Sequence, residues 1–413
     1  MKTVWLINPY GPIPGEGWCD YRYTVIGDIL SKHNYRVIWW TANFSHHFKK
    51  FRSKDWVDIE INPYFIIRLV PTCEYKKNIS IKRIKFELRY AWNVYRRALR
   101  ESPPVCIIGA DPPQIVGLLS VKLSKYFNAK LILDIIDLWP EIFVIALPSL
   151  FRSVGSAFFY IFYLLRRYNL CQADAIIAAS EIFFEVLKKK VPFKKDRPFV
   201  TIFNGIDVAW FRALMDRDNE LPEEIKLKIG QKTSKDIWAI YAGSLNNNYD
   251  IKTLLNAALY LKKENNIKIF IIGDGIFREE IMNFITVNGL TNLVYLGKLQ
   301  YEELIQFYKY CDIGICPYHK ESTAWPVKLY DYTAAGLPII NSSQFLKEFI
   351  EVNKLGINYE PGNVCSFVNA LNMLATHTTL RKQMATNSYN IAMKFDKNIQ
   401  YNKLVNLLNA ILL

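Results

Sequence analysis

The stretch WPVKLYDYTAAGLP, at residues 325–338, predicts the fold most directly. It begins as a proline-containing loop, continues with a helical pattern and ends at Gly336, a typical helix C-cap, just before the apolar strand candidate Leu337–Asn341. A helix that leads through a glycine into a buried strand is the repeating unit of a parallel α/β sheet. Lys328 and Asp331 are three residues apart, so they share one face of this helix.

The same alternation of apolar runs and helical segments continues along the whole chain. Continuous apolar runs are typical of parallel strands that are buried on both faces. In the first half the strand candidates are Lys2–Asn8, Tyr35–Thr41, Phe65–Val70, Val105–Gly109, Lys130–Ile135 and Asp174–Ala179, with helical stretches such as Tyr21–His33 and Gln114–Tyr126. In the second half they are Asp236–Ala242, Ile267–Ile272, Leu293–Leu296, Asp312–Cys316 and Leu337–Asn341, with helical stretches Ile251–Lys263 and Tyr301–Tyr310. Two such runs predict an α/β protein with two doubly wound, Rossmann-like domains.

The length of 413 residues also favours two domains, because one hydrophobic core rarely serves so long a chain. A polar, charged stretch at residues 192–219 marks the seam. We therefore predict a first domain at residues 1–195, a second at 196–377, and C-terminal helices at 378–413. Leu404, Leu407, Leu408 and Leu412 fall on one face of the last helix.

Charge is concentrated in the first half of the chain. Residues 1–200 hold 30 Lys/Arg against 17 Asp/Glu, whereas residues 201–413 hold 22 against 21. The excess indicates that the first domain faces phosphates or an anionic lipid surface. Residues 76–100 alone carry nine basic side chains and one acid, interleaved with aromatic residues, and Lys188–Lys190 with Lys194–Lys195 form a further basic cluster. A basic, aromatic helix suits an anionic membrane surface, and a solvated basic face is the alternative. No nucleic-acid-binding motif accompanies these residues, so we expect no nucleic acid partner.

A second segment bears on the membrane question. Ile142–Leu165 is largely apolar, but Pro148 and Arg152 interrupt it, and its uninterrupted part is too short to span a bilayer. We predict a helix that lies in a membrane interface, with a buried core helix as the alternative. The first apolar run stops at Asn8-Pro9, so we expect no signal peptide and a location in the cytoplasm, peripheral on the inner face of the cell membrane.

Metal binding is not expected. The seven cysteines are scattered without a CxxC pair, His46-His47 is the only histidine cluster, and Asp216-Arg217-Asp218 lies in the seam rather than at a strand end.

Three groups of residues are candidates for binding a sugar nucleotide. Gly15 and Gly17 follow the first strand and let the backbone approach a ligand, although a tight structural turn is the alternative. Gly273 and Gly275 end another strand, with Arg278 placed to reach a phosphate or to remain solvated. Lys328 can neutralise a diphosphate and Asp331 can accept both ribose hydroxyls, and a surface ion pair between them is the alternative.

Seven motifs in order resemble those of the family-4 glycosyltransferases. In the second half they are residues 241–245 with 249–251, 272–275, 295–299 and 326–338, and in the first half 15–17, 137–141 and 204–207. The stretch Asp137-Leu138-Trp139-Pro140-Glu141 is closest to bacterial sugar transferases of envelope polysaccharide assembly. The resemblance implies a GT-B fold, in which two domains face each other across a cleft and a final helix crosses back to the first. It also implies an acceptor-binding, membrane-facing first domain and a donor-binding second domain.

The resemblance further implies the members of the site. The implied donor-binding residues are Gly15, Gly17, Ser244, Gly273, Gly275, Arg278, Lys298, Leu299, Thr323, Val327, Lys328 and Asp331. The implied catalytic residues are Asp137, Lys328 and Glu321.

Several positions depart from the family pattern. Thr323 replaces the first of two glutamates that the family carries, with Glu321 as a possible substitute, and Asp331 stands at the second. Ser244 and Tyr249 replace the usual Arg–Lys pair, so Lys328 and Arg278 remain to meet the diphosphate. Ile136 stands where a histidine often precedes Asp137, which leaves Asp137 nearest the acceptor hydroxyl, with a helix N-cap or a core hydrogen-bonding role as its alternative.

The sequence thus predicts a glycosyltransferase that moves a sugar from a nucleotide-sugar donor, UDP-linked, to a lipid-linked or glycan acceptor in bacterial surface polysaccharide biosynthesis, with retention of configuration and with no metal or other cofactor. The partners expected are the donor, a lipid-linked saccharide acceptor and an anionic membrane surface. The alternatives are a GT-B sugar-nucleotide epimerase and a non-catalytic GT-B scaffold subunit.

Overall fold

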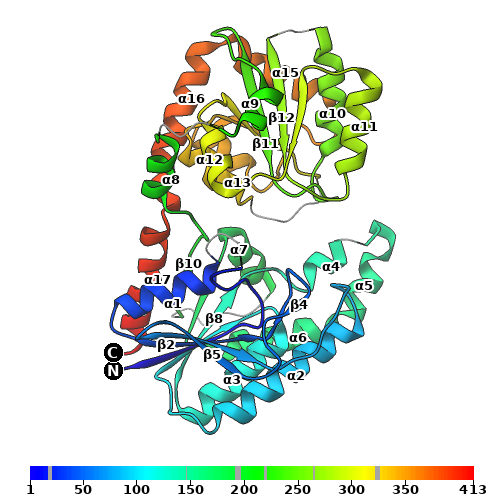
Figure 1. Ribbon diagram of the computed structural model, residues 1–413. Coiled ribbons are helices and arrows are strands. Elements are labelled where there is room, and N and C mark those ends of the chain that lie inside the picture. The colour runs from blue at the N-terminus through cyan, green and yellow to red at the C-terminus, as the bar shows by residue number, and fades with distance from the viewer. Residues whose placement is uncertain (17–20, 146, 191–196, 218–220, 264–265, 321–325) are drawn as a thin grey trace. The chain divides into compact units, whose positions relative to one another are not determined.

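The computed structural model describes residues 1–413 except 17–20, 146, 191–196, 218–220, 264–265 and 321–325. It consists of two compact units (Figure 1). Unit 1 contains Met1–Asn204 and Lys397–Leu413, and unit 2 contains Gly205–Asp396. The chain therefore passes between the units at Asn204–Gly205, where the sequence analysis places the division after residue 195. Residues 378–396, expected in a separate C-terminal segment, belong to unit 2.

Unit 1 is built on an eight-stranded sheet with the order β10-β9-β8-β7-β1-β2-β6-β5. The strands are β1 (Thr3–Ile7), β2 (Arg36–Ala42), β5 (Val57–Asn62), β6 (Phe65–Val70), β7 (Cys106–Ala110), β8 (Lys130–Ile135), β9 (Ala175–Ala178) and β10 (Phe199–Thr201), with a separate hairpin of β3 (Phe44–Ser45) and β4 (Lys50–Phe51). All neighbours pair in parallel except β5, which runs antiparallel to β6. The helices are α1 (Arg22–Lys32), α2 (Ile81–Ala98), α3 (Gln114–Phe127), α4 (Glu141–Ile145), α5 (Arg152–Phe158), α6 (Tyr160–Gln172), α7 (Glu181–Lys190) and α17 (Lys397–Ile411), with a 3-10 turn at Ser149–Phe151.

Unit 2 has a six-stranded parallel sheet with the order β13-β12-β11-β14-β15-β16. Its strands are β11 (Ile237–Ala242), β12 (Ile267–Ile272), β13 (Leu293–Gly297), β14 (Ile313–Cys316), β15 (Ile339–Asn341) and β16 (Gly356–Asn358). Its helices are α8 (Val208–Met215), α9 (Glu223–Ile229), α10 (Ile251–Tyr260), α11 (Arg278–Asn288), α12 (Tyr301–Tyr308), α13 (Lys328–Ala334), α14 (Lys347–Val352), α15 (Val364–Thr376) and α16 (Thr378–Ile391), with 3-10 turns at Leu261–Lys263 and Ala392–Phe395.

The strands predicted from apolar runs are confirmed, with ends that differ by one or two residues. Most of these strands are buried along their whole length, because helices cover both faces of each sheet. The sequence analysis missed β5, whose apolar and polar residues alternate along Val57–Asn62. This is the pattern of a half-exposed strand at the edge of a sheet. It also missed β10 and β16, which are only three residues long.

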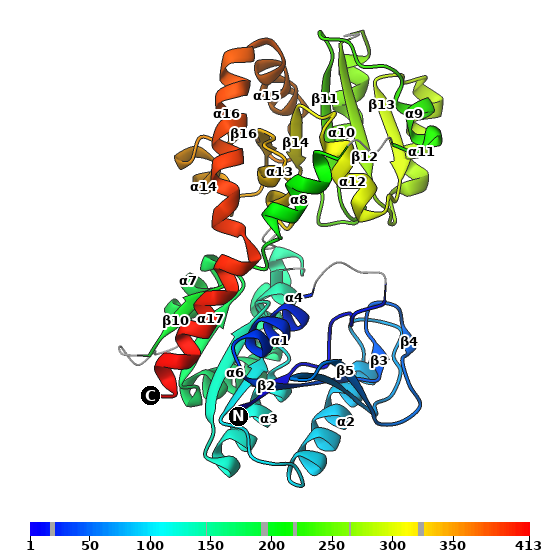
Figure 2. The ribbon, with the colours of Figure 1, turned by 60° about the vertical axis from the view of Figure 1, so that its left-hand side comes forward.

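The last helix belongs to unit 1. Helix α17 packs against α1 (Figure 2), and Leu404, Leu407 and Leu408 are buried there. This confirms the leucine face read from the sequence and explains why Lys397–Leu413 joins unit 1 although it follows unit 2 in the chain.

The segment Ile142–Leu165 does not form the single helix predicted. It is divided among α4, the 3-10 turn, α5 and α6, with Pro148 between the first two of these. The alternative of a buried core helix is also wrong, because Val154 is 67% exposed, Phe158 76% and Ile161 64%. Among the described residues, no helix has both the length and the apolar character needed to cross a membrane.

Helix α2 is amphipathic in an unusual way. Ser80 caps it by accepting a hydrogen bond from the backbone N–H of Arg83, and Phe86, Tyr90 and Val94 bury one face against the unit. The opposite face carries exposed apolar side chains as well as basic ones. These are Ile81, Ile84, Leu88 and Trp92, with Lys82, Lys85, Arg89 and Arg96 beside them. We call these eight residues the α2 stripe.

Candidate functional site

Glycine turns at the carboxyl ends of β11 and β12 bring two backbone segments into contact. Gly243 and Gly273 have φ angles of 155° and 142°, which side-chain-bearing residues rarely adopt. A Cβ atom added to Gly273 would lie 1.8 Å from the carbonyl oxygen of Gly243. The two backbone segments are therefore in close contact at this edge, and Gly273 has no room for a side chain.

Lys328, the first residue of α13, lies next to these turns. It is only 7% exposed, and a Cβ atom on Gly243 would be 3.3 Å from its Cε. Its Nζ is 4.1 Å from the ring centroid of Tyr249, 4.9 Å from that of Tyr318 and 5.2 Å from that of Tyr241. We call these three rings the tyrosine cage. Nζ also donates a hydrogen bond of 3.4 Å to the Tyr318 hydroxyl.

Lys328 carries a buried positive charge at this edge of the sheet. Within the described part of the chain, no Asp or Glu oxygen lies within ion-pair distance of its Nζ. The faces of aromatic rings stabilise a cation, but by only about 0.5–2 kcal/mol each. Burial of an unpaired charge costs several kcal/mol. An anion bound beside the ammonium would recover this cost, so the site is suited to a phosphate group.

Asp331 lies one turn further along α13 and is also buried. Its carboxylate accepts hydrogen bonds from the hydroxyls of Tyr301, at 2.9 Å, and Tyr308, at 3.4 Å. Burial raises the pKa of Asp331 to about 6, against the opposing effects of the two tyrosines and Lys328. The alternative of a surface ion pair between Lys328 and Asp331 is wrong, since both are buried and each has other partners.

Most of the remaining donor-binding predictions lie at the same edge of the unit 2 sheet. The backbone carbonyl of Ser244 accepts a hydrogen bond of 2.6 Å from the Tyr241 hydroxyl. Arg278 begins α11 after the β12 turn that contains Gly275, and Lys298 and Leu299 follow β13. Val327 precedes α13 and is exposed. The geometry therefore unites Lys328 with Gly243 and Gly273, whereas Arg278 and Lys298 are exposed at the rim.

Four of the predicted positions do not lie at this edge among the described residues of unit 2. Gly15 follows β1 in unit 1, so it belongs to a different sheet from the other donor-binding candidates. Gly17, Glu321 and Thr323 lie outside the described residues.

The sequence motifs give no role to the tyrosines. Tyr241 and Tyr249 appear only as parts of motifs, and Tyr318, Tyr301 and Tyr308 lie outside every motif. One sequence signal does point to the tyrosines. Tyr249 follows a strand and stands where the glycosyltransferase family that this chain resembles carries a lysine. An aromatic residue in place of a cation can support another cation nearby.

In unit 1, Asp137 follows the carboxyl end of β8 and remains accessible to solvent. Desolvation by the surrounding residues raises the pKa of Asp137, while a backbone hydrogen bond and the Arg83 guanidinium act in the opposite direction. It does not cap a helix, because α4 begins only at Glu141. Nearby, the Arg83 Cζ lies 4.4 Å from the ring centroid of Trp139.

Metal ligands are not gathered anywhere in the described residues, where no group of three or more His, Cys, Asp or Glu side chains could hold an ion.

Comparison with known structures assigns the fold of this chain to a class of enzymes. The fold is that of the GT-B glycosyltransferases, as predicted. Sucrose-phosphate synthase from Thermosynechococcus elongatus has a TM-score of 0.75 and 14% identity over 100% of this chain and 99% of its own. HepE of Anabaena, solved in complex with UDP, has a TM-score of 0.68 and 14% identity over 99% of this chain and 100% of its own. At this identity the likeness concerns the fold alone.

Two sequence comparisons give more detail. Residues 223–391, which lie within unit 2, match the model of "Glycosyl transferases group 1". A proposed teichuronic acid biosynthesis glycosyltransferase of Bacillus subtilis, TuaH, is 22% identical over 175 residues. The match spans 42% of this chain and only 41% of that relative.

Proposed function

We propose that this protein is a glycosyltransferase that takes a sugar from a nucleotide-sugar donor bound to unit 2. The observation that carries the proposal is the buried Lys328 ammonium beside the glycine turns, which faces three aromatic rings and has no carboxylate partner among the described residues. The group 1 domain over residues 223–391 supports it. A UDP-linked donor is favoured because HepE, of the same fold, was solved with UDP.

The chemistry follows from the charges. When the bond between the sugar and the diphosphate breaks, negative charge grows on the diphosphate oxygens, and the Lys328 ammonium stabilises that charge in a site with little water. We assign to Asp331, one turn away, the acceptance of the ribose hydroxyls. In this proposal Lys328 does the work that a metal ion does elsewhere, so no cofactor is required. Transfer with retention of configuration remains part of the proposal, and the anomer of the product, read by NMR, tests it.

The test of the donor site is Lys328→Met, which keeps most of the side-chain volume and removes the charge. Loss of a charge-assisted contact in the transition state predicts a fall of about 10- to 100-fold in nucleotide release from sugar nucleotides. Lys252→Met is a matched control, because Lys252 is exposed on α10. An unchanged rate in Lys328→Met would remove the basis of the proposal.

The same assay separates transfer from the other functions considered. A transferase releases nucleotide faster when a membrane extract supplies the acceptor. An epimerase changes the sugar without the extract, and a scaffold subunit does neither. The readout is a panel of sugar nucleotides with and without the extract.

We further propose that unit 1 docks on an anionic membrane and receives a lipid-linked acceptor there, in bacterial surface polysaccharide biosynthesis. The support is the α2 stripe, in which Ile81 is 85% and Trp92 60% exposed among basic side chains. Exposed apolar residues of α5 and α6 add a second apolar region on the same unit, and α3 packs between α2 and α6. The partial likeness to TuaH agrees with an envelope role.

Vesicle binding tests the docking proposal. Replacement of Ile84, Leu88 and Trp92 by Ser should lower binding to phosphatidylglycerol vesicles, because it removes apolar burial that salt does not affect. High salt should lower the remaining, electrostatic part. The control is Leu227→Ser with Val287→Ser, two apolar residues on unit 2 that are more exposed, at 83% and 84%, than the three replaced on α2. A well-folded protein that shows no preference for phosphatidylglycerol over phosphatidylcholine would contradict docking.

A further inference from the structure

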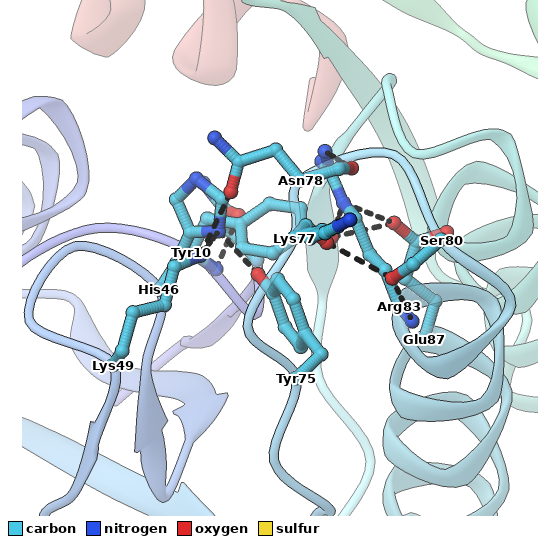
Figure 3. Close-up of polar contacts among 10 residues, drawn as sticks. Tyr10, His46, Lys49, Tyr75, Lys77, Asn78, Ser80, Arg83 and Glu87 are labelled. Atoms are coloured by element: carbon cyan, nitrogen blue, oxygen red, sulfur yellow. Dashed lines mark hydrogen bonds and ion pairs between the residues drawn. The ribbon is translucent and has the colours of Figure 1, made fainter.

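A second cluster of polar side chains lies in unit 1, at the carboxyl edge of its sheet (Figure 3). Tyr10 follows β1, His46 and Lys49 belong to the β3–β4 hairpin that follows β2, and Tyr75 and Asn78 lie between β6 and α2. In parallel sheets this edge is where ligands bind. The proposed donor-site chemistry uses none of these residues.

The inner side of the cluster is a closed hydrogen-bond network. The Tyr10 hydroxyl donates to Glu87 Oε1 at 2.5 Å, and Arg83 Nε donates to that hydroxyl at 3.0 Å and to Glu87 at 3.2 Å. The Arg83 guanidinium also lies between two rings, 5.1 Å from the centroid of Tyr10 and 4.4 Å from that of Trp139. Arg83 is therefore already neutralised by Glu87, and its guanidinium forms a rigid side of the cluster.

The imidazole of His46 is neutral in this cluster. Burial, together with Lys49 and Arg83, lowers the pKa of His46 to about 3. Its Nδ1 is hydrogen-bonded to the Tyr75 hydroxyl and lies 3.5 Å from Lys49 Nζ. Since an ammonium can only donate, Nδ1 accepts, and the ring proton is on Nε2. The half-buried imidazole thus offers one N–H donor.

Lys49 supplies the unbalanced charge. Its Nζ donates to Asn78 Oδ1 at 2.8 Å and lies 4.3 Å from the Tyr75 ring centroid. Within the described part of the chain, no carboxylate is within ion-pair distance of Nζ. The backbone of Lys49 has a φ of 53°, a left-handed conformation that glycine or asparagine would adopt at lower cost.

We propose that Lys49, His46 and the Asn78 side chain form an anion site for a phosphate or diphosphate ester, held in place by Tyr75 and Arg83. This inference rests on the proposed function, because it makes the ligand the phosphate group of the acceptor. Arg83 packs on Trp139, two residues after Asp137, so the site adjoins the group assigned to the acceptor hydroxyl. A phosphate bound there would orient a phosphate-linked acceptor on unit 1.

The experiment is calorimetric titration of the full-length protein with inorganic pyrophosphate. Two binding sites are expected, one lost in Lys328→Met and the other weakened at least about tenfold in Lys49→Asn. Asparagine suits the left-handed backbone, so this variant should fold. His46→Phe keeps the ring packing and removes the N–H, and should also weaken the second site. Lys50→Asn, with the same charge change one residue along the hairpin, is the matched control.

The outcomes distinguish this proposal from that of the donor site. If Lys49→Asn binds pyrophosphate like the wild type, or if Lys50→Asn weakens it as much, the second site is refuted while the donor site stands. A short-chain prenyl diphosphate in detergent should displace pyrophosphate from the second site alone. If pyrophosphate binds but the prenyl diphosphate does not displace it, the site takes a free anion and the acceptor assignment is wrong.

Discussion

Replacement of Asp331 by Asn should make the protein more stable at neutral pH while it weakens nucleotide binding. Asp331 is buried on α13 and accepts hydrogen bonds from the hydroxyls of Tyr301 and Tyr308. The amide oxygen of Asn can accept from one hydroxyl, and its NH2 group, in the place of the second carboxylate oxygen, can donate to the other hydroxyl. The amide has the same shape as the carboxylate but carries no charge to desolvate. The buried carboxylate therefore lowers the free energy of unfolding at neutral pH, which is typical of a residue that is retained for binding.

The size of the effect follows from the pKa. Burial raises the pKa of Asp331 from 3.8 to about 6. A group whose folded-state pKa is raised stabilises the fold below its unfolded-state pKa, and this contribution is lost as pH rises through the folded-state value. A shift of about two units, at about 1.4 kcal/mol per unit, corresponds to about 3 kcal/mol over the whole titration, of which the wild type loses about 2 kcal/mol between pH 4 and pH 7 and the rest below pH 4. Asp331→Asn has no such loss.

The assay is urea unfolding of both proteins from pH 4 to pH 7.5, followed by tryptophan fluorescence. The free energy of unfolding of Asp331→Asn minus that of the wild type should rise by about 2 kcal/mol across this range. Asp216→Asn, at the exposed C-terminal end of α8, should show almost no change and serves as the control. UDP affinity is measured in parallel. A difference that is flat with pH would refute the reasoning from burial, and equal UDP affinity would make the carboxylate structural only.

Two other substitutions test separate parts of the structure. Gly273→Ala places a Cβ atom 1.8 Å from the Gly243 carbonyl oxygen, so a thermal melt should show that the protein loses about 2–4 kcal/mol of its free energy of unfolding. Gly362→Ala, whose added Cβ atom meets nothing within 4 Å, should lose less stability. Equal losses in the two variants would contradict the close approach of Gly273 to Gly243. Asp137→Asn should leave nucleotide-sugar binding unchanged, slow transfer, and abolish the rise of the rate with pH that a carboxylate of raised pKa produces in the wild type. A pH profile that keeps its acid limb in Asp137→Asn would assign the limb to another group.

The fold could be predicted from the sequence because its signals are local. A parallel strand covered on both faces must be apolar along its length, so runs such as Ile267–Ile272 identify themselves. Strand β5 escaped because only one of its faces is covered, and its alternation of Val57, Asp58 and Ile59 is a weaker signal in so short a stretch. The break of Ile142–Leu165 into several short helices depends on packing in unit 1 as well as on Pro148.

The site was decided partly by sequence and partly by tertiary structure, for a physical reason. A spacing of three residues placed Lys328 and Asp331 on one helix face without any knowledge of the fold. Their environments required the fold, because Tyr241, Tyr249 and Tyr318 come from the ends of two strands that are neighbours only in the sheet. Likewise, Lys49 meets Asn78 and Tyr75 only once β2 and β6 are paired. Burial, and the lack of a carboxylate partner among the described residues, are properties of that assembled neighbourhood, and they are the basis of our proposal that these lysines bind anions.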